Sequence, residues 1–243
     1  MSGWLAVAGL GPGADALITP EVQAALAEAT DVVGYIPYVA RIAPRPGLTL
    51  HPSDNRVELD RARDALRMVA EGRRVVVVSS GDPGVFAMAS AVFEALEPCP
   101  EWHGLDIRVL PGITAMLAAA AAAGAPLGHD FCAINLSDNL KPLDTVLRRV
   151  RLAAEADFAM AFYNPRSRAR PEGFGRVLEV LRACCEPGRL MIFARAVSTP
   201  EQALRILPLS EVTEDMADMR TVVIVGSSRT RQVGRFTYTP RSA

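Results

Sequence analysis

Residues that could do chemistry gather at two turns, each placed directly after a short apolar run. The first turn, Gly9-Leu10-Gly11-Pro12-Gly13-Ala14, follows residues 5–8, and the second, Gly81-Asp82-Pro83-Gly84, follows a run of four valines. Glycines let a ligand approach the backbone closely, and the Asp82 carboxylate can accept hydrogen bonds from a hydroxyl or ammonium group. Open α/β sheets bind ligands at such strand ends, so we expect a small-molecule site here. The local alternative is that Asp82 closes an Asx turn or caps the next helix.

Further candidate residues stand beside other expected strands. Thr114 follows a Pro-Gly turn, where it could cap a helix or bind a ligand, and Asn164 and Ala196 follow two strands in the second half. His129 and Asp130 come just before a strand. A histidine can transfer protons near neutral pH and an adjacent carboxylate can orient its ring, so this pair is a candidate acid/base. A purely structural pair is the alternative.

The elements that must position these residues are strands and helices that alternate along the chain. Short β-branched runs alternate with segments of helical periodicity, which predicts mainly parallel sheets, and a run of four valines is typical of a strand buried on both faces. Thr19, Pro20 and Glu21 suit the N-cap and first turn of a helix. The pattern predicts strands at residues 5–8, around 32–33, 74–79, 107–110, 131–136, 158–163, 190–194, 204–209, 222–225 and 236–238, and helices from Thr19 and over 56–71, 85–96, 113–123, 145–155 and 174–184.

The joint between two domains is expected near an alanine-rich helix. This segment, 113–123, is followed by the Gly-Ala-Pro-Leu-Gly stretch 124–128. We therefore expect an N-terminal α/β domain at residues 1–112 and a C-terminal α/β domain at 113–243. A chain of 243 residues is long enough for two small α/β domains with real cores.

The composition excludes several classes of function. Half of the residues are hydrophobic and the net charge is −1, so no basic surface for nucleic acid is expected. The N-terminus has no signal-peptide pattern, and the longest apolar stretch, 113–125, is short and dominated by alanine. The four cysteines have neither metal-site nor disulfide-framework spacing. We expect a cytoplasmic protein with no metal site and no membrane partner.

One motif suggests a different class of enzyme. Residues 9–14 formally match the dinucleotide pattern G-x-G-x-x-G/A, so a nicotinamide-dependent oxidoreductase is an alternative. That motif should lead directly into a helix, whereas the helix expected here begins only at Thr19, and no acidic residue follows the second strand. Sequences for a Walker A loop, a nucleophile elbow or H-E-x-x-H do not occur. A nucleotide-binding module without catalysis is a third alternative.

Taken in order, the motifs resemble those of the tetrapyrrole methylase family. The resemblance runs from Val7 to about Arg229 and rests on residues 9–13, 81–83, 111–115 and 222–226. Other segments resemble family members that act on corrin precursors, namely Val33-Gly34-Tyr35, Ser79-Ser80-Gly81-Asp82, Gly128-His129-Asp130-Phe131, Leu136-Ser137-Asp138 and Tyr163-Asn164-Pro165-Arg166-Ser167. Many relatives place Asp directly after Gly-Pro-Gly, where this chain has Ala14 and then Asp15.

The resemblance implies a fold, a cofactor and a reaction. It implies a homodimer that binds S-adenosylmethionine between two α/β domains, releases S-adenosylhomocysteine, and methylates precorrin-3B at C17 with ring contraction to precorrin-4. Within the family, the alternative is a sister enzyme acting at another ring carbon or on cobalt-loaded precorrin-3B. The implied cofactor contacts are Pro12, Gly81, Asp82, Val85, Thr114, Ala115, Asn164 and Ala196.

Substrates of this family carry many carboxylates, and this chain is rich in arginine. Lys141 is its only lysine. Arginine binds carboxylates through paired, charge-assisted hydrogen bonds. The candidates for substrate binding are Arg41, Arg45, Arg56, Arg166, Arg168 and Arg170. Methyl transfer from a sulfonium requires in-line approach of the reactants. Ring contraction requires proton movement, for which His129 and Asp130 are the candidates.

Overall fold

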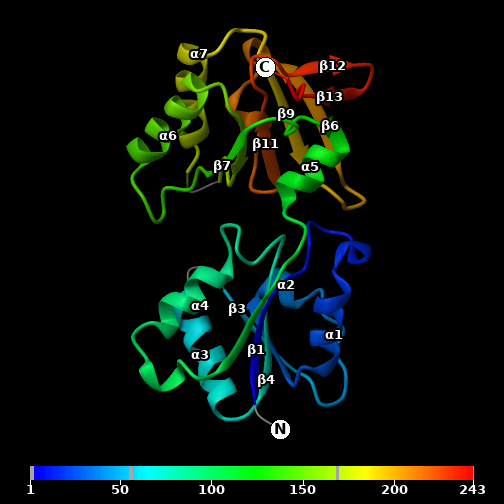
Figure 1. Ribbon diagram of the computed structural model, residues 1–243, viewed down its shortest axis with the longest axis vertical. Coiled ribbons are helices and arrows are strands. Elements are labelled where there is room, and N and C mark those ends of the chain that lie inside the picture. The colour runs from blue at the N-terminus through cyan, green and yellow to red at the C-terminus, as the bar shows by residue number, and fades with distance from the viewer. Residues whose placement is uncertain (1–2, 55–56, 168–169, 243) are drawn as a thin grey trace. The chain divides into compact units, whose positions relative to one another are not determined.

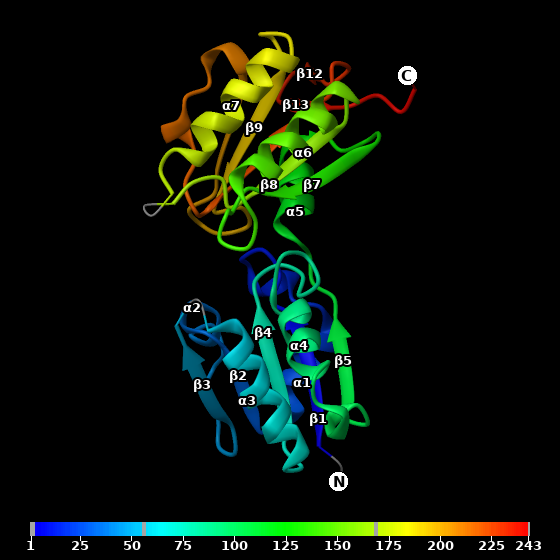
Figure 2. The same cartoon turned by 90° about the vertical axis from the view of Figure 1, so that its left-hand side faces the viewer.

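The structure is a computed structural model that describes residues 3–54, 57–167 and 170–242. The chain divides into two compact units, Met1–Thr114 (unit 1) and Ala115–Ala243 (unit 2). Figures 1 and 2 show each unit as a sheet accompanied by helices. The division lies two residues from the boundary expected between 112 and 113. Within the described residues, no helix combines the length and apolar character that crossing a bilayer requires.

The sheet of unit 1 contains five strands, and all their pairings are parallel. Its order is β3-β2-β4-β1-β5. The connection after β1 leads across β4 to β2, whereas the connection after β4 leads in the opposite direction, across β1, to β5. Such a reversal is called a topological switch point. Ligands bind at such a switch point in open α/β sheets, beside the carboxyl ends of β1 and β4. The strands are β1 (Trp4–Gly9), β2 (Asp31–Tyr35), β3 (Thr49–Ser53), β4 (Arg74–Ser79) and β5 (Asp106–Leu110).

Helices cover both faces of this sheet, because alternate residues of each central strand point to opposite sides. Leu5 and Val77 belong to the core that includes residues of α3 and α4, whereas Ala6 and Val76 belong to the core that includes residues of α1 and α2. The helices are α1 (Pro20–Glu28), α2 (Ile36–Val39), α3 (Glu58–Ala70) and α4 (Met88–Leu96), with short 3-10 turns at η1 (Asp15–Leu17) and η2 (Pro100–Trp102).

The first long helix begins as its sequence predicts. The Thr19 hydroxyl accepts a hydrogen bond from the Val22 N–H at 3.3 Å, and Pro20 occupies the first turn. Such a cap contributes about 1 kcal/mol. Helix α4 differs from the prediction, since it begins at Met88 rather than at residue 85. The reason is local: Phe86 has a positive φ of 55°, which an α-helix does not allow.

The main sheet of unit 2 is mixed. Its order is β10-β9-β11-β8-β7, and only the β7–β8 pair is parallel among its four pairings in the described chain. Over the two five-stranded sheets, parallel pairings still outnumber antiparallel ones, as predicted, but they are concentrated in unit 1. The strands are β7 (Phe131–Asn135), β8 (Ala159–Tyr163), β9 (Leu190–Arg195), β10 (Ala203–Pro208) and β11 (Thr221–Val225).

Two different helical layers cover the faces of this second sheet. The alanines of α5 pack on Ala161 and Ile192, and α6 and α7 pack on Phe162 and Phe193 from the other side. The helices are α5 (Ala115–Ala123), α6 (Leu143–Glu155) and α7 (Gly173–Cys184), with 3-10 turns η3 (Leu209–Glu211) and η4 (Glu214–Met216). A small sheet of order β12-β13-β6 is formed by β6 (Gly124–Ala125), β12 (Arg231–Val233) and β13 (Phe236–Tyr238).

Candidate active site

Three loops are held together at the carboxyl edge of the unit 1 sheet, and we call them the loop cradle: residues 9–13, 81–84 and 111–114. The Gly11 N–H donates to the Gly81 carbonyl at 3.2 Å, and the Gly81 N–H donates back to the Gly11 carbonyl at 2.9 Å. The three loops follow β1, β4 and β5, which are neighbours in the sheet. Parallel strands thus bring together the turns that the sequence marks as chemically important.

Glycine is required in the loop cradle because the backbones touch. A Cβ on Gly112 would lie 2.8 Å from the Gly9 carbonyl oxygen, and still closer to that of Gly81. Gly11 and Gly81 have positive φ values of 66° and 64°, which side-chain-bearing residues rarely adopt. The absence of side chains therefore lets the three loops pack backbone against backbone.

The Asp82 carboxylate accepts hydrogen bonds from two of the three loops of the cradle. Its Oδ1 accepts a hydrogen bond from the Gly84 N–H at 2.8 Å, and its Oδ2 accepts one from the Gly112 N–H at 3.1 Å. The first contact is the Asx turn that we considered as the local alternative. The second joins two loops that are 30 residues apart. Because a carboxylate offers about four lone-pair sites, Asp82 keeps acceptor capacity for a ligand.

The other predicted cofactor residues of unit 1 lie in or beside the same cradle. Pro12 and Val85 are half-buried, and the Val85 N–H donates to the Asp82 carbonyl at 3.3 Å. Thr114 is 5% exposed and directly precedes α5. These residues are brought to one edge of one sheet.

Unit 2 gathers the remaining predicted cofactor residues at one edge of its own sheet. Strands β8 and β9 run in the same direction, since both are antiparallel to β11, so Asn164 and Ala196 follow their carboxyl ends on either side of the start of β11. Both residues have positive φ values, 52° and 48°. Helix α5, which begins at Ala115, starts at this edge too, because the Met116 N–H donates to the Tyr163 hydroxyl at 3.0 Å.

Strained backbone of this kind often accompanies function. Asn164 tolerates a positive φ better than most residues do, and its side-chain amide donates to Asn135 Oδ1 at 3.1 Å. Asn135 Oδ1 also accepts from the Ser137 N–H at 2.9 Å. The sequence analysis did not single out Asn135. Its position as the last residue of β7, beside the end of β8, is the signal that could have found it.

Two of the predicted substrate-binding arginines, Arg41 and Arg45, donate hydrogen bonds to backbone carbonyls of the chain itself. The Arg41 guanidinium donates to the carbonyls of Leu10 and Gly13, at 3.0 and 2.9 Å, and so braces the first loop of the cradle. Arg45 donates to three carbonyls at the end of α1, at 2.6 to 3.0 Å. Because these groups already hold the chain's own oxygens, the geometry favours a structural role for both.

Two other predicted arginines lie at the carboxyl edge of the unit 2 sheet. Arg166 and Arg170 stand in the segment after β8, at the same edge as Asn164. Arg166 donates to a backbone carbonyl at 3.1 Å, and Arg170 lies 3.6 Å from an Asp138 carboxylate oxygen. Each guanidinium keeps further N–H donors. Arg56 and Arg168, which were predicted with them, lie outside the described residues.

His129 and Asp130 are separated from the other candidates of unit 2. They precede β7, and the Asp130 carbonyl accepts from the N–H of Ala159, the first residue of β8. This is the amino-terminal edge of the sheet, opposite Asn164 and Ala196. Both side chains are exposed, and His129 Nδ1 lies 3.8 Å from Asp130 Oδ2, beyond hydrogen-bond distance. The sequence places the pair before a strand, and the parallel pairing of β7 with β8 puts that position at the edge opposite Asn164.

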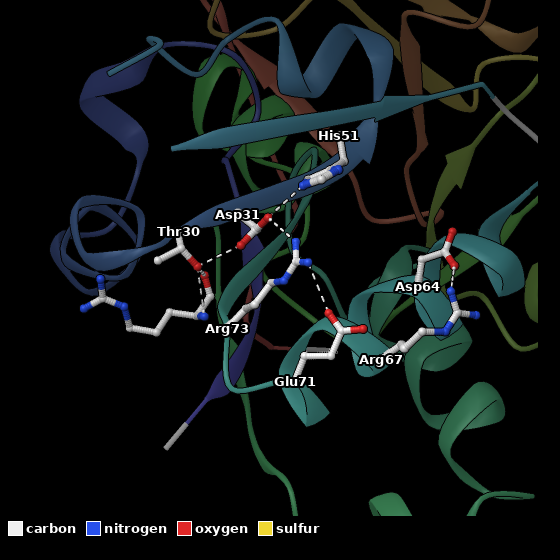
Figure 3. Close-up of polar contacts among 8 residues, drawn as sticks. Thr30, Asp31, His51, Asp64, Arg67, Glu71 and Arg73 are labelled. Carbon is white, nitrogen blue, oxygen red and sulfur yellow. Dashed lines mark hydrogen bonds and ion pairs between the residues drawn. The ribbon is translucent and has the colours of Figure 1, made fainter. Parts of the chain in front are cut away.

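Figure 3 shows a polar cluster at the amino-terminal edge of the unit 1 sheet. Asp31, which is 3% exposed, accepts from the Thr30 hydroxyl at 2.8 Å and bonds His51 Nε2 at 2.8 Å. Burial alone would raise the pKa of Asp31, but these hydrogen bonds and the charge of Arg73 together hold it below its usual value. The cluster joins β2 to the edge strand β3, so we interpret it as structural.

The geometry disfavours the dinucleotide alternative. After Gly13 the chain forms the 3-10 turn η1, and α1 begins only at Pro20, so no helix N-terminus directly follows the glycines. Asp31, the acidic residue of the second strand, lies at the wrong end of β2 to reach a ribose. No group of three or more potential metal-binding side chains occurs within residues 3–54, 57–167 and 170–242.

Comparisons with known proteins show the family of the chain. The family model of the tetrapyrrole (corrin/porphyrin) methylases matches residues 5–213, so the chain belongs to this family and is a methyltransferase. The chain is 51% identical to a precorrin-3B C(17)-methyltransferase of a Sinorhizobium species, over 99% of this chain and 97% of that protein. It is 74% identical to the crystal structure of the methyltransferase CobJ, with a TM-score of 0.97 and coverage of 98% and 100% of the two chains.

A more distant structure shares the fold. A uroporphyrin-III C-methyltransferase from Thermus thermophilus, complexed with S-adenosylhomocysteine, is 24% identical with a TM-score of 0.67. The comparison covers 92% of this chain and 97% of that one.

Proposed function

We propose that this methyltransferase transfers a methyl group from S-adenosylmethionine to C17 of precorrin-3B, with ring contraction to precorrin-4. The observation that carries the proposal is the loop cradle, in which Gly9, Gly81 and Gly112 meet at the switch point of a parallel sheet. The similarity to a precorrin-3B C(17)-methyltransferase over nearly the whole of both chains supports the choice of substrate.

The residues present fit the proposed donor. Glycine at positions 11 and 81 allows the left-handed backbone that shapes the cradle, which would receive the adenosine and methionine parts. Asp82, with two lone-pair sites already used by backbone N–H groups, can accept from a ribose hydroxyl or from the methionine ammonium. Val85 and Ala196 would supply apolar contact. The complex of the Thermus thermophilus relative contains S-adenosylhomocysteine, which is the product that S-adenosylmethionine leaves after methyl transfer.

S-adenosylmethionine supplies the methyl group, whose bond to sulfur breaks as the bond to C17 forms. The protein's main task is to hold the two reactants in line, since no covalent enzyme intermediate is needed. A strong anion beside the sulfur would oppose a reaction in which the positive charge is lost.

We assign the substrate's carboxylates to Arg166 and Arg170 rather than to Arg41 and Arg45. The first two lie at the carboxyl edge of the unit 2 sheet and keep spare N–H donors, whereas the second two hold backbone carbonyls. We do not include His129 in the proton transfers of ring contraction, because it lies at the opposite edge of its sheet. The proposal includes a homodimer, which the family resemblance implies and which sedimentation of the purified protein checks. It also includes a cytoplasmic location, which the spacing of the four cysteines favours.

Calorimetric titration tests the donor site. We expect S-adenosylhomocysteine to bind with micromolar affinity and NAD not to bind. Binding of NAD alone would overturn the proposal and restore the oxidoreductase alternative. Parallel turnover of metal-free and cobalt-loaded precorrin-3B then separates the two forms of the substrate.

A further inference from the structure

The loop between β9 and β10, residues 196–202, contains two residues in a conformation that side-chain-bearing residues rarely adopt. Ala196 and Ser198 have positive φ values of 48° and 65°. In this left-handed region the Cβ atom crowds the following carbonyl oxygen, so the conformation persists only where surrounding contacts enforce it. Glycine would adopt it without strain, yet the chain has alanine and serine here.

Hydrogen bonds within unit 2 fix both peptide groups of Ala196. Its N–H donates to the Arg220 carbonyl at 2.8 Å. Its carbonyl accepts from the Thr199 N–H at 3.2 Å and from the Thr199 hydroxyl at 2.8 Å. The next residue, Val197, is 4% exposed and belongs to the core that includes the alanines of α5. Because φ and ψ are set by the two peptide planes beside a residue, these contacts together hold Ala196 in its left-handed conformation.

The Thr199 hydroxyl is fully engaged inside the loop. Its oxygen also accepts from the Glu201 N–H at 3.2 Å, so the group both donates and accepts. A second side chain closes the same loop, since Gln202 Oε1 accepts from the Ser198 N–H at 2.7 Å. A hydroxyl has a single hydrogen, and that of Thr199 is used on the Ala196 carbonyl. Any effect of this hydroxyl on a ligand therefore passes through Ala196.

The place of Ala196 gives this arrangement a functional consequence. Ala196 follows β9 at the carboxyl edge of the unit 2 sheet, and in the proposed function it supplies apolar contact to the methyl donor. Its φ sets the direction of its methyl group and of the peptide that follows. A right-handed φ would turn both away from their present direction. A loop that is already fixed also spares the donor the cost of ordering it on binding.

We propose that Thr199 is a positioning residue, whose hydroxyl holds Ala196 in the left-handed conformation that donor binding requires. The inference rests on the proposed function, and it adds a residue that acts on the donor only through Ala196.

Calorimetry with S-adenosylhomocysteine tests the hydroxyl. Thr199→Val removes it and keeps the shape of the side chain, whereas Thr199→Ser keeps it. We expect Thr199→Val to raise the dissociation constant about fivefold, the factor that loss of a hydrogen bond gives, and Thr199→Ser to stay within about twofold of the wild type. Thr199→Ala also lacks the hydroxyl and carries the test should Thr199→Val not fold. Equal affinities with and without the hydroxyl would overturn the inference.

Thr230→Val is the matched control. The Thr230 hydroxyl also forms a hydrogen bond of 2.8 Å, with the Thr239 hydroxyl. Thr230 follows β11, whose end lies beside the starts of β8 and β9, at the edge opposite Ala196. We expect Thr230→Val to lower the thermal midpoint and to leave the affinity for S-adenosylhomocysteine unchanged. An equal loss of affinity in Thr230→Val and Thr199→Val would assign the effect to general destabilisation and overturn the inference.

A second background separates positioning from a merely structural role. Glycine adopts a left-handed φ without strain, so in an Ala196→Gly background the hydroxyl has less to enforce. We expect Thr199→Val to change the affinity less than about twofold in that background, against about fivefold in the wild type. A fivefold change in both backgrounds would overturn the inference, because it would show that Thr199 does not act through Ala196.

Failure of the proposed function gives a different pattern. A wild type that binds S-adenosylhomocysteine but does not methylate precorrin-3B contradicts the proposed substrate, and the role of Thr199 is then still decided by the affinities alone. A wild type that does not bind S-adenosylhomocysteine overturns both.

Discussion

Replacing Gly112 with alanine would break the loop cradle at its tightest point. The added Cβ would lie 2.8 Å from the Gly9 carbonyl oxygen, whereas ordinary contacts begin near 3.4 Å. The two backbones must therefore separate by about 0.6 Å there, and by more against the Gly81 carbonyl. Backbone oxygens cannot rotate away as flexible side chains do, so the loops after β1, β4 and β5 would move apart.

The expected loss follows from that displacement. Misplacing reacting groups by about 1 Å can cost about a hundredfold in rate, so we expect kcat/KM to fall by a factor on the order of 10 to 100. Overpacking of this kind also costs about 1–3 kcal/mol of stability. Calorimetry with S-adenosylhomocysteine should show at least about tenfold weaker binding by the folded variant.

Gly104→Ala is the matched control, because a Cβ at Gly104 meets nothing within 4 Å. We expect this variant to bind S-adenosylhomocysteine as the wild type does. Wild-type affinity in Gly112→Ala would refute the reasoning, since it would show that the donor does not depend on the close contact of these loops.

Three further predictions concern other parts of the chain. Because the pKa of Asp31 is lowered in the folded state, the stabilisation that Asp31 gives is present above about pH 4 and is lost as the pH falls through the folded pKa. Asp31→Asn should therefore lower the free energy of unfolding by about 2 kcal/mol at pH 7, and should make that free energy, measured by urea unfolding, depend less on pH between about pH 5 and 2. An unchanged pH dependence in the variant would contradict this. Asn164→Ala and Asn164→Gly should both weaken S-adenosylhomocysteine binding about fivefold, because both remove the amide contact to Asn135. Wild-type affinity in the glycine variant alone would contradict this and assign the effect to backbone strain. His129→Ala should keep wild-type turnover and yield of precorrin-4, whereas loss of ring contraction with methylation intact would return His129 to the mechanism.

Much of the fold could be predicted because its signals are local. The valine run of β4 and the Thr19-Pro20 cap of α1 are decided by neighbouring residues. The direction of β11 could not be predicted in the same way, since a run buried on both faces fits a parallel or an antiparallel strand equally. Strand β3 gave little signal, because this edge strand is partly exposed and contains Pro52.

The candidate site shows the same limit. The glycine turns were predicted because each follows a short apolar run closely in the sequence. The tasks of Arg41 and Arg45 depend on carbonyls 16 to 31 residues away, which spacing does not reveal. His129 lies apart from the other candidates of unit 2 because it precedes its strand, whereas Asn164 and Ala196 follow theirs.

The central claim is best tested by following the transferred carbon itself. Purified protein is incubated with precorrin-3B and S-adenosylmethionine labelled with ¹³C in the methyl group, and the product is examined by NMR. The account predicts a single labelled methyl group on C17 of a ring-contracted product. A label on another ring carbon, or no transfer from S-adenosylmethionine, would contradict it.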